Sequence, residues 1–191
     1  MHAKTRAAII VAAGLLLLQA ASATVVGRLS FEELVDTSDL IVSGRITRAW
    51  AAWDADHKYI WTHYEMSVKS ALKGTPGSTV EIAEPGGALE DKVLSIAGTV
   101  VYTTGENVLV FLQRMPNGYL RTTGWGQGRF LVGDNGRIHA DSTLRGLEII
   151  DTRTPLPASM PLTTLDGMGL NEFSLRIAAR ARVASGTGST R

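Results

Sequence analysis

The sequence predicts a mainly β domain, a small antiparallel barrel or sandwich, with a short N-terminal helix and a C-terminal helix. About six or seven short apolar or alternating segments follow one another at roughly even spacing, separated by glycine, proline and asparagine. No long helical pattern lies between these segments, as it would in an alternating α/β fold. The run at residues 108–112 is apolar on both faces, which is typical of a central strand.

The first 23 residues have the pattern of a secretory signal peptide. Lys4 and Arg6 form a basic start, residues 7–18 form an apolar run, and Ala21-Ser22-Ala23 is a small-residue cleavage site. The alternative is a membrane anchor, but a span needs about 20 apolar residues and this run is shorter. We therefore expect cleavage after Ala23 and a secreted or periplasmic protein, with no membrane contact once the signal peptide is removed.

The expected domain plan follows from this start. Residues 24–150 form the β-barrel domain, residues 151–184 form an irregular crossing plus the C-terminal helix, and residues 185–191 form a disordered tail.

The chain contains no cysteine, which excludes disulfides and thiol chemistry. Loss of Lys4 and Arg6 from the 19 basic residues leaves 17 against 18 acidic ones. This balance argues against nucleic acid as a partner, because phosphate binding needs clustered basic residues.

The first elements are predicted from local patterns. Residues 29–39 have near-helical apolar spacing, with Ser30 as N-cap and Glu33 as its capping-box partner. Residues 40–46 form a first strand, in which Gly44 marks a bulge or a close backbone approach. Residues 50–58 are polar and predict a loop. Residues 59–72 alternate with period two, so Tyr64 lies on one face of a long strand and Trp61 on the other.

The later elements are predicted in the same way, with Gly- and Pro-rich turns as boundaries. The expected strands are residues 79–83, 108–112, 119–123, 129–132 and 137–139. Residues 124–128 are rich in glycine and predict a tight turn or bulge. Residues 171–183 carry an apolar face behind Asn171 and predict the C-terminal helix.

Several segments between residues 30 and about 132 carry a resemblance to known proteins: Ser30–Leu34, Ser38–Ile46, Leu72–Gly74, Pro85–Gly87, Gly105–Leu112 and Gly124–Phe130. Together they look like a group of uncharacterised exported bacterial proteins. This likeness does not indicate any particular activity. Residues 39–46 and 68–74 are also distantly similar to the netrin-like, OB-type barrels of tissue inhibitors of metalloproteinases. That likeness implies an OB-like barrel. Those inhibitors present an N-terminal cysteine to zinc, and this chain has none, so the likeness does not extend to their mechanism.

Aromatic residues are the candidate binding residues. We predict a binding surface from Trp53, Tyr59, Trp61, His63 and Trp125. Exposed indoles anchor protein partners or stack on sugars. In the alternative interpretation the tryptophans cap the ends of the barrel core, and for Trp61 the two interpretations stay open.

The sequence contains no strong catalytic or metal-binding motif. His57 and His63 would lie roughly 20 Å apart on an extended strand, so one ion cannot bridge them. His63 and Glu65 would be about 7 Å apart, which is typical of a solvated strand face. We therefore expect no metal and no cofactor.

Three functional hypotheses follow. The first is a non-catalytic interaction module that contacts another exported protein, a protease being one candidate, or a glycan. The second is a hydrolase or binding protein for a polysaccharide or small molecule, using loop carboxylates such as Glu84, Glu90, Asp91 and Asp134. The third is a structural module of a cell-surface assembly.

Overall fold

The computed structural model describes residues 24–140, 147–150 and 160–187. The predicted signal peptide lies outside them, as do residues 141–146, 151–159 and 188–191. The strands are β1 (Thr24–Gly27), β2 (Leu40–Trp53), β3 (Ile60–Lys73), β4 (Thr79–Pro85), β5 (Gly87–Leu89), β6 (Lys92–Leu94), β7 (Asn107–Arg114), β8 (Leu120–Thr122), β9 (Arg129–Val132), β10 (Ile138–Ala140) and β11 (Leu147–Ile150). The helices are α2 (Phe31–Thr37) and α3 (Leu170–Thr187), with 3-10 turns η1 (Trp125–Gly128) and η3 (Leu162–Leu165).

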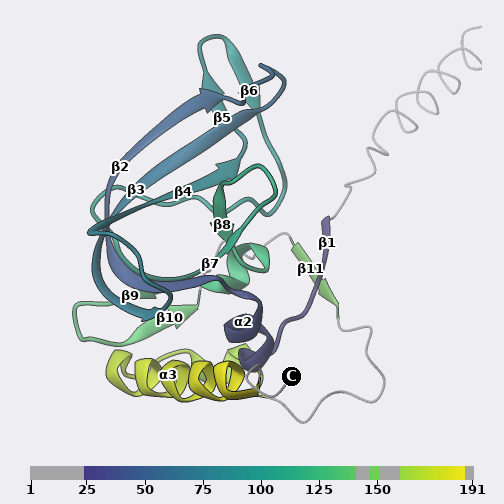
Figure 1. Cartoon of the computed structure of the whole chain (residues 1–191). Helices are drawn as coiled ribbons and strands as arrows, with labels where there is room; N and C mark the ends of the chain where they lie inside the picture. Colours follow the sequence, from purple (N-terminus) through teal and green to yellow (C-terminus); the bar gives the residue numbers. More distant parts are fainter. Residues whose placement is uncertain (1–23, 141–146, 151–159, 188–191) are drawn as a thin grey trace, which may run out of the picture.

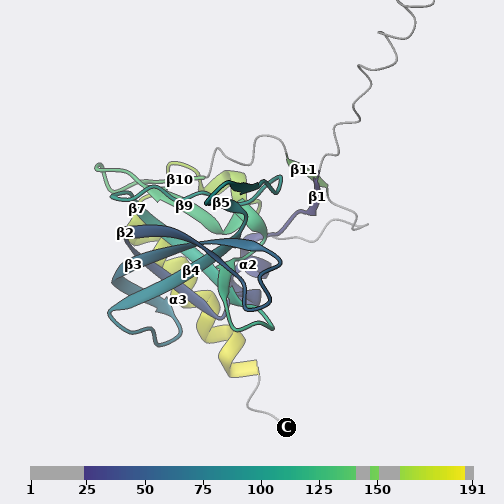
Figure 2. The ribbon, with the colours of Figure 1, turned by 90° about the horizontal axis from the view of Figure 1, so that it is seen from above.

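Within the described residues, seven strands form one antiparallel sheet in the order β10-β9-β7-β2-β3-β4, and β8 also pairs with β7. The long strands β2 and β3 have three register shifts, one of them next to Gly44. A Cβ at Gly44 would overlap the carbonyl oxygen of Ser67, so the prediction of a bulge or close backbone approach there is confirmed. Bulges bend strands, and the sheet is strongly curved (Figures 1 and 2).

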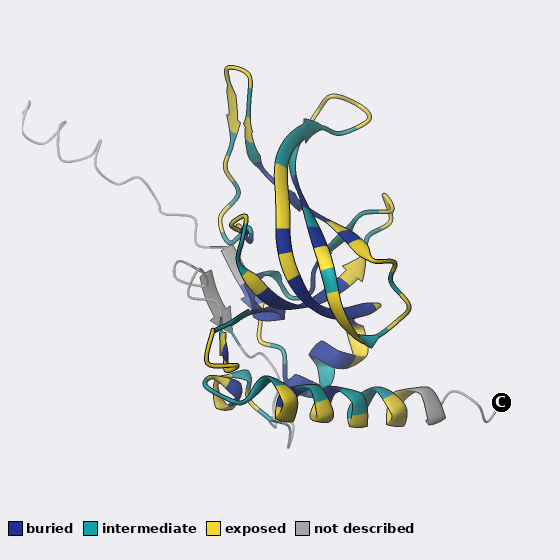
Figure 3. Cartoon of the chain, turned by 90° about the vertical axis from the view of Figure 1, so that its left-hand side faces the viewer, coloured by how far each residue is buried: buried dark blue, intermediate teal, exposed yellow. Residues whose placement is uncertain are grey.

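The curved sheet has a hydrophobic core on each face. Val108, Val110 and Leu112 of β7 point to the inside of the curve, where they pack with residues of β2, β3 and β4. Leu109 and Phe111 point the opposite way, toward α2 and α3. All five are completely buried, so the prediction of a central strand is confirmed. Helix α3 lies below the sheet, with its outer side exposed (Figures 1 and 3).

Both predicted helices are confirmed. The hydroxyl of Ser30 accepts a hydrogen bond from the backbone N–H of Glu33, and the Glu33 carboxylate accepts one from the N–H of Ser30, which completes the capping box. Helix α3 packs on α2 through Phe31 and Phe173, whose ring centroids are 5.8 Å apart. It continues to Thr187, so residues 185–187 are helical and not part of the predicted tail. No helix among the described residues is long and apolar enough to cross a membrane.

Two predictions about local structure need correction. Residues 50–53 belong to strand β2 and not to a loop, because the hairpin continues with Trp50 opposite His63 and Trp53 opposite Ile60. Cross-strand pairing stabilises these residues, although their own sequence lacks a strand pattern. The small β5–β6 hairpin and the parallel pair β1–β11 were not predicted. Strands of three or four residues are too short to show a period.

The mainly β antiparallel class with two flanking helices is confirmed, but the curved sheet does not close into a barrel within the described residues. Strands β4 and β8 lie side by side without forming a ladder, and we call the gap between them the seam. One end of the seam is bridged by a side chain, because the Glu84 carboxylate accepts a hydrogen bond from the backbone N–H of Thr122 at 2.8 Å.

Candidate functional site

Four rings gather on the outer face of the sheet, and we call them the aromatic face: Trp50, Trp61, His63 and Tyr119. Trp50 of β2 lies opposite His63 of β3, and the two rings are stacked with centroids 5.4 Å apart. Tyr119 precedes β8 and meets His63 edge-on at 5.4 Å and Trp61 edge-on at 5.1 Å. Such stacked and edge-to-face pairs attract one another. The aromatic face is therefore assembled from the β2–β3 hairpin and from Tyr119, which lies much later in the sequence.

His63 is held in one orientation by a carboxylate. Its Nδ1 lies 2.8 Å from Oε1 of Glu81 on the neighbouring strand β4, and only 6% of the residue is exposed. An ionised carboxylate can only accept, so Nδ1–H donates this bond. The sequence spacing pointed to Glu65 as the nearest carboxylate, but Glu65 accepts from the hydroxyl of Thr47 at 2.9 Å. A neighbour across the sheet lies closer than a residue two positions along the strand.

Charged groups surround the aromatic face. The guanidinium of Arg48 lies 4.2 Å from the centroid of a Trp50 ring, a cation–π geometry. Glu65 lies opposite Arg48 on one side and opposite Glu81 on the other. Two carboxylates therefore lie near one guanidinium, which makes the rim of the aromatic face favourable for a positive charge.

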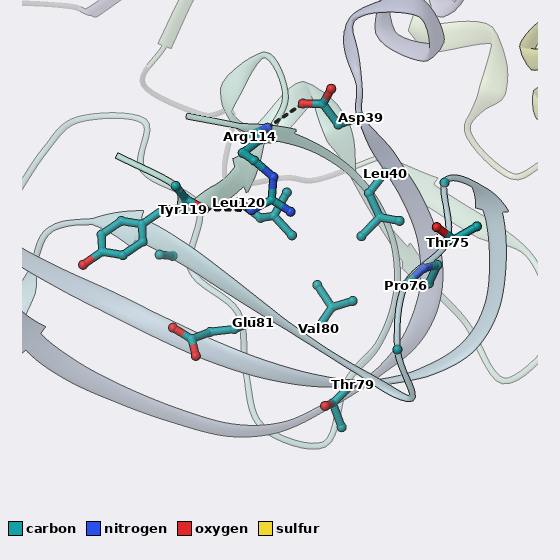
Figure 4. Close-up of a pocket in the computed structure, with 14 residues that line it drawn as sticks. Asp39, Leu40, Thr75, Pro76, Thr79, Val80, Glu81, Arg114, Tyr119 and Leu120 are labelled. Carbon is teal, nitrogen blue, oxygen red and sulfur yellow. Dashed lines mark hydrogen bonds between the residues drawn. The ribbon is translucent and has the colours of Figure 1, made fainter. Parts of the chain in front are cut away.

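A groove of about 630 Å³ opens beside the aromatic face, along the seam (Figure 4). Its apolar side chains Leu40, Val80 and Leu120 pack on the inner core, and Tyr119 lies where the groove meets the aromatic face. On the far side the backbone N–H of Arg114 donates to Asp39. The volume falls within the range of ordinary ligand sites. The groove and the aromatic face together form the candidate functional site.

Glu84 is completely buried at the other end of the seam. Burial raises the pKa of its carboxyl group, while the hydrogen bonds from Thr122 and the positive charge of Arg121 oppose the rise. The Arg121 Nε lies 3.5 Å from the carboxylate. The Thr122 hydroxyl forms a further hydrogen bond with the Tyr102 hydroxyl at 2.5 Å. Glu84 thus belongs to a buried polar network that joins β4 to β8 and is not accessible to a substrate.

The structure brings only two of the five predicted binding residues together, Trp61 and His63. Trp53 points to the opposite face of the hairpin, because its cross-strand partner is Ile60 and not Trp61. There it stacks with His57 at 6.2 Å and faces the Lys92 ammonium at 5.0 Å.

The other two predicted residues also lie apart from the aromatic face. Tyr59 is 57% exposed, just before β3. Trp125 begins the η1 turn with a positive φ of 59°, and the Arg121 guanidinium lies 4.7 Å from its ring centroid. Residues 124–128 thus form a tight turn, as predicted.

Three members of the site were missed from the sequence: Trp50, Tyr119 and Glu81. Trp50 and Glu81 reach the face of His63 through the register of β2 and β4 against β3, which the sequence pattern does not show. Tyr119 has no sequence signal either, because its position depends on how β8 approaches β4.

The four carboxylates of the hydrolase hypothesis do not form one site. Glu84 is buried in the seam, Glu90 and Asp91 lie in the turn between β5 and β6, and Asp134 lies in the turn between β9 and β10. In Figure 1 these two hairpins lie at opposite ends of the molecule. Over the described ranges, no three histidine or acidic residues gather closely enough to hold a metal ion.

Comparison with known proteins does not assign the chain to a family. No protein-family model matches it, and no curated protein sequence does. The geometry of the aromatic face and the groove is therefore the basis for the functional proposal.

Proposed function

We propose that this chain is an exported, non-catalytic binding module that contacts another exported protein through the aromatic face and the adjoining groove. The observation that carries the proposal is the set of four rings packed together beside an open groove. Tryptophan and tyrosine dominate the energetic centres of protein interfaces because they bury a large area at low entropic cost. The signal-peptide pattern of residues 1–23 supports export.

The indole of Trp61 supports a binding role for the aromatic face. Its Nε1 is buried, and no described residue accepts a hydrogen bond from it. Buried donors are nearly always paired in folded proteins. Because this atom is buried, a carbonyl or carboxylate of a partner would accept from it only after the neighbouring side chains move aside, and that contact would add directional specificity to the ring contacts.

A protease is one candidate partner, because of the likeness to netrin-like inhibitor barrels. The N-terminal cysteine of those inhibitors is absent here, so the contact would be made by the aromatic face instead. A glycan is the other partner class that the half-buried tryptophans suit, since sugars stack on indoles. The groove favours the protein partner, because it continues the aromatic face along the edge of a strand.

The test is a comparison of two tryptophan variants of the exported chain. The chain is immobilised, exposed to the native exported fraction, and the retained proteins are identified and titrated. Trp61→Ala should weaken stoichiometric capture at least tenfold, since truncation at the centre of an interface costs about 2 kcal/mol or more. Trp53→Ala removes the same side chain from the opposite face and should leave capture unchanged.

Two results would contradict the proposal. One is equal capture by the wild type and by a Trp61→Ala variant with an unchanged thermal midpoint. The other is the absence of any saturable protein partner in the exported fraction, together with saturable, Trp61-dependent binding to a glycan panel. The second result would mean that the aromatic face binds a sugar and not a protein.

A further inference from the structure

Strand β2 has a neighbour on both edges along its first half, but on only one edge along its second half. Residues 41–45 pair with β3 on one side and with β7 on the other. The β7 side ends at Ile46, whose N–H donates to the carbonyl of Glu106 at 3.0 Å. Residues 48–53 pair with β3 alone, and over the described ranges no strand pairs with their other edge. We call this edge of residues 48–53 the free edge, and it forms the outer margin of the long β2–β3 hairpin (Figure 1).

The hydrogen bonds of the hairpin show which residues of the free edge direct their backbone groups outward. At the tip, Asp54 N–H donates to the carbonyl of Tyr59 at 2.9 Å, and from there the register is continuous through the free edge. Hydrogen-bonded pairs alternate in an antiparallel ladder. The even-numbered residues of this part of β2 therefore bond to β3, and Ala49, Ala51 and Trp53 direct their N–H and C=O groups outward. No backbone hydrogen bond joins these groups to another described residue.

The far edge of β3 supports this assignment. Gly86 N–H donates to the carbonyl of Ile60 at 2.8 Å, so Ile60 directs its backbone groups toward β4. Trp53 lies opposite Ile60 on the other side and therefore does not bond to it. The two ends of the hairpin thus give the same pattern of outward groups.

The free edge is open and carries no charge between residues 49 and 53. Ala49 is exposed, and Ala51 is half-buried. The β5–β6 hairpin packs on the inner side of β2, where a Cβ at Gly87 would lie 3.6 Å from the Cβ of Ala51, but neither of its strands pairs with β2. Edge strands are usually protected by charged residues, proline or a covering element, and residues 49–53 contain neither charge nor proline. Such an edge can pair with a further strand.

We propose that two copies of this chain dimerise by pairing their free edges antiparallel, about a two-fold axis at Ala51. This inference goes beyond the proposed binding function and does not rest on it. Two copies related by a two-fold axis present the same segment to each other in opposite directions, as an antiparallel ladder requires. The outward N–H and C=O groups of Ala49, Ala51 and Trp53 then meet those of Trp53, Ala51 and Ala49 of the second copy.

The sequence of the free edge is complementary to itself in this register. Residues 48–54 read Arg-Ala-Trp-Ala-Ala-Trp-Asp. Opposite charges attract across a ladder, and a large side chain packs well beside a small one. The proposed register places the following residues of the two copies opposite each other: Arg48 and Asp54, Ala49 and Trp53, Trp50 and Ala52, and the two Ala51 residues. Each tryptophan therefore faces an alanine, and the basic residue of the segment faces the acidic one.

A shift of the axis by one residue loses this match. An axis at Trp50 would place the two Trp50 rings opposite each other and Arg48 opposite Ala52. An axis at Ala52 would place Trp50 opposite the carboxylate of Asp54. The side chains of the free edge thus fit a second copy in one register, which is why we assign this edge to self-association and not to another protein. Because Trp50 belongs to the aromatic face, the dimer would carry both aromatic faces on one side of a continuous sheet.

Sedimentation of the exported chain over a range of concentrations tests the dimer. We expect a reversible equilibrium between monomer and dimer in the wild type. Ala51→Pro removes an N–H that does not bond to β3, and proline is tolerated at such positions of edge strands, so a thermal scan should show an intact fold. Dimerisation of this variant should be at least tenfold weaker, because both hydrogen bonds at the axis are lost. A wild type that stays monomeric up to about 1 mM, or equal dimerisation by the proline variant, would overturn the inference.

Single cysteines test the register, because the chain has none of its own. In the proposed dimer the Cα atoms of the two Ala51 residues lie about 5.5 Å apart, within the range of a disulfide. The two Ala49 residues lie about 13 Å apart along the ladder, which is too far for one. Under mild oxidation Ala51→Cys should therefore form a covalent dimer at least tenfold faster than Ala49→Cys, although Ala49 is the more exposed residue. Equal rates, or a faster reaction of Ala49→Cys, would contradict the register.

Further outcomes separate this inference from the proposed function. Trp61→Ala should weaken partner capture but leave dimerisation unchanged, since Trp61 lies on β3, one strand away from the free edge. Dimers in a chain that captures no exported protein would support the inference and leave the proposed function without support. A monomeric chain whose Ala49 and Ala51 amides are protected from hydrogen exchange only by a captured protein would make that protein the occupant of the free edge and overturn the dimer.

Discussion

Replacing Glu84 tests how the open side of the sheet is held together. Its carboxylate accepts from the Thr122 N–H at 2.8 Å and lies 3.5 Å from Arg121 Nε, and the residue is completely buried. Glu84→Ala would leave the Thr122 N–H without an acceptor. Glu84→Gln keeps an acceptor oxygen of nearly the same shape and removes only the charge. The pair of variants therefore separates the hydrogen bond from the buried charge.

The expected magnitudes follow from these contacts. An unpaired buried donor costs about 1–3 kcal/mol, and the lost side-chain volume adds a cavity. Relief of the buried negative charge partly offsets this loss, so Glu84→Ala should lower the free energy of unfolding by about 2 kcal/mol near neutral pH. Glu84→Gln should lie within about 1 kcal/mol of the wild type, or above it, because it avoids the cost of burying a charge.

The stability contributed by Glu84 should change with pH in a defined direction. Burial raises the pKa of Glu84 in the folded state, so its contribution to stability is fully present below the unfolded pKa and is lost as pH rises through the folded pKa. The wild type should therefore lose stability relative to Glu84→Gln as the pH rises above the unfolded pKa of about 4. Urea unfolding followed by tryptophan fluorescence measures both variants. A Glu84→Ala variant as stable as the wild type, or a gap to Glu84→Gln that widens in acid, would refute this account of the seam.

The same urea assay tests three further positions. Gly44→Ala forces a Cβ against the Ser67 carbonyl and should lower the free energy of unfolding by about 1–3 kcal/mol. Gly77→Ala is the control, because its nearest contact would be 3.7 Å away, and it should lower the free energy of unfolding clearly less. Equal losses in the two variants would contradict the close approach at Gly44. Phe173→Ala removes the completely buried ring between α3 and the sheet and should cost about 3–5 kcal/mol, and a loss below about 1 kcal/mol would mean that α3 does not pack there. Ser30→Ala removes the cap of α2 and should cost about 1 kcal/mol, and no loss would remove the capping box from the stability of this helix.

Local sequence patterns were sufficient for the elements whose structure depends on near neighbours. The capping box of α2 is formed by Ser30 and Glu33, three residues apart, and both are visible as a pair in the sequence. The alternation of residues 59–72 predicted β3 and the two faces of its central part, with Tyr64 inside and Trp61 outside. The apolar run at residues 108–112 predicted the central strand, because only a strand covered on both sides buries such a run.

The sequence alone thus determined the class of fold, the two helices and the central strand, whereas the candidate functional site was decided by the tertiary structure. The stack of Trp50 on His63 depends on the register of β2 against β3, and the pairing of His63 with Glu81 depends on β4. Tyr119 reaches this face only because β8 follows the curve of the sheet toward β4. The open seam is also a global property, since a sheet closes or stays open according to its summed twist and bulges. These are long-range pairings, and no local period of the sequence encodes them.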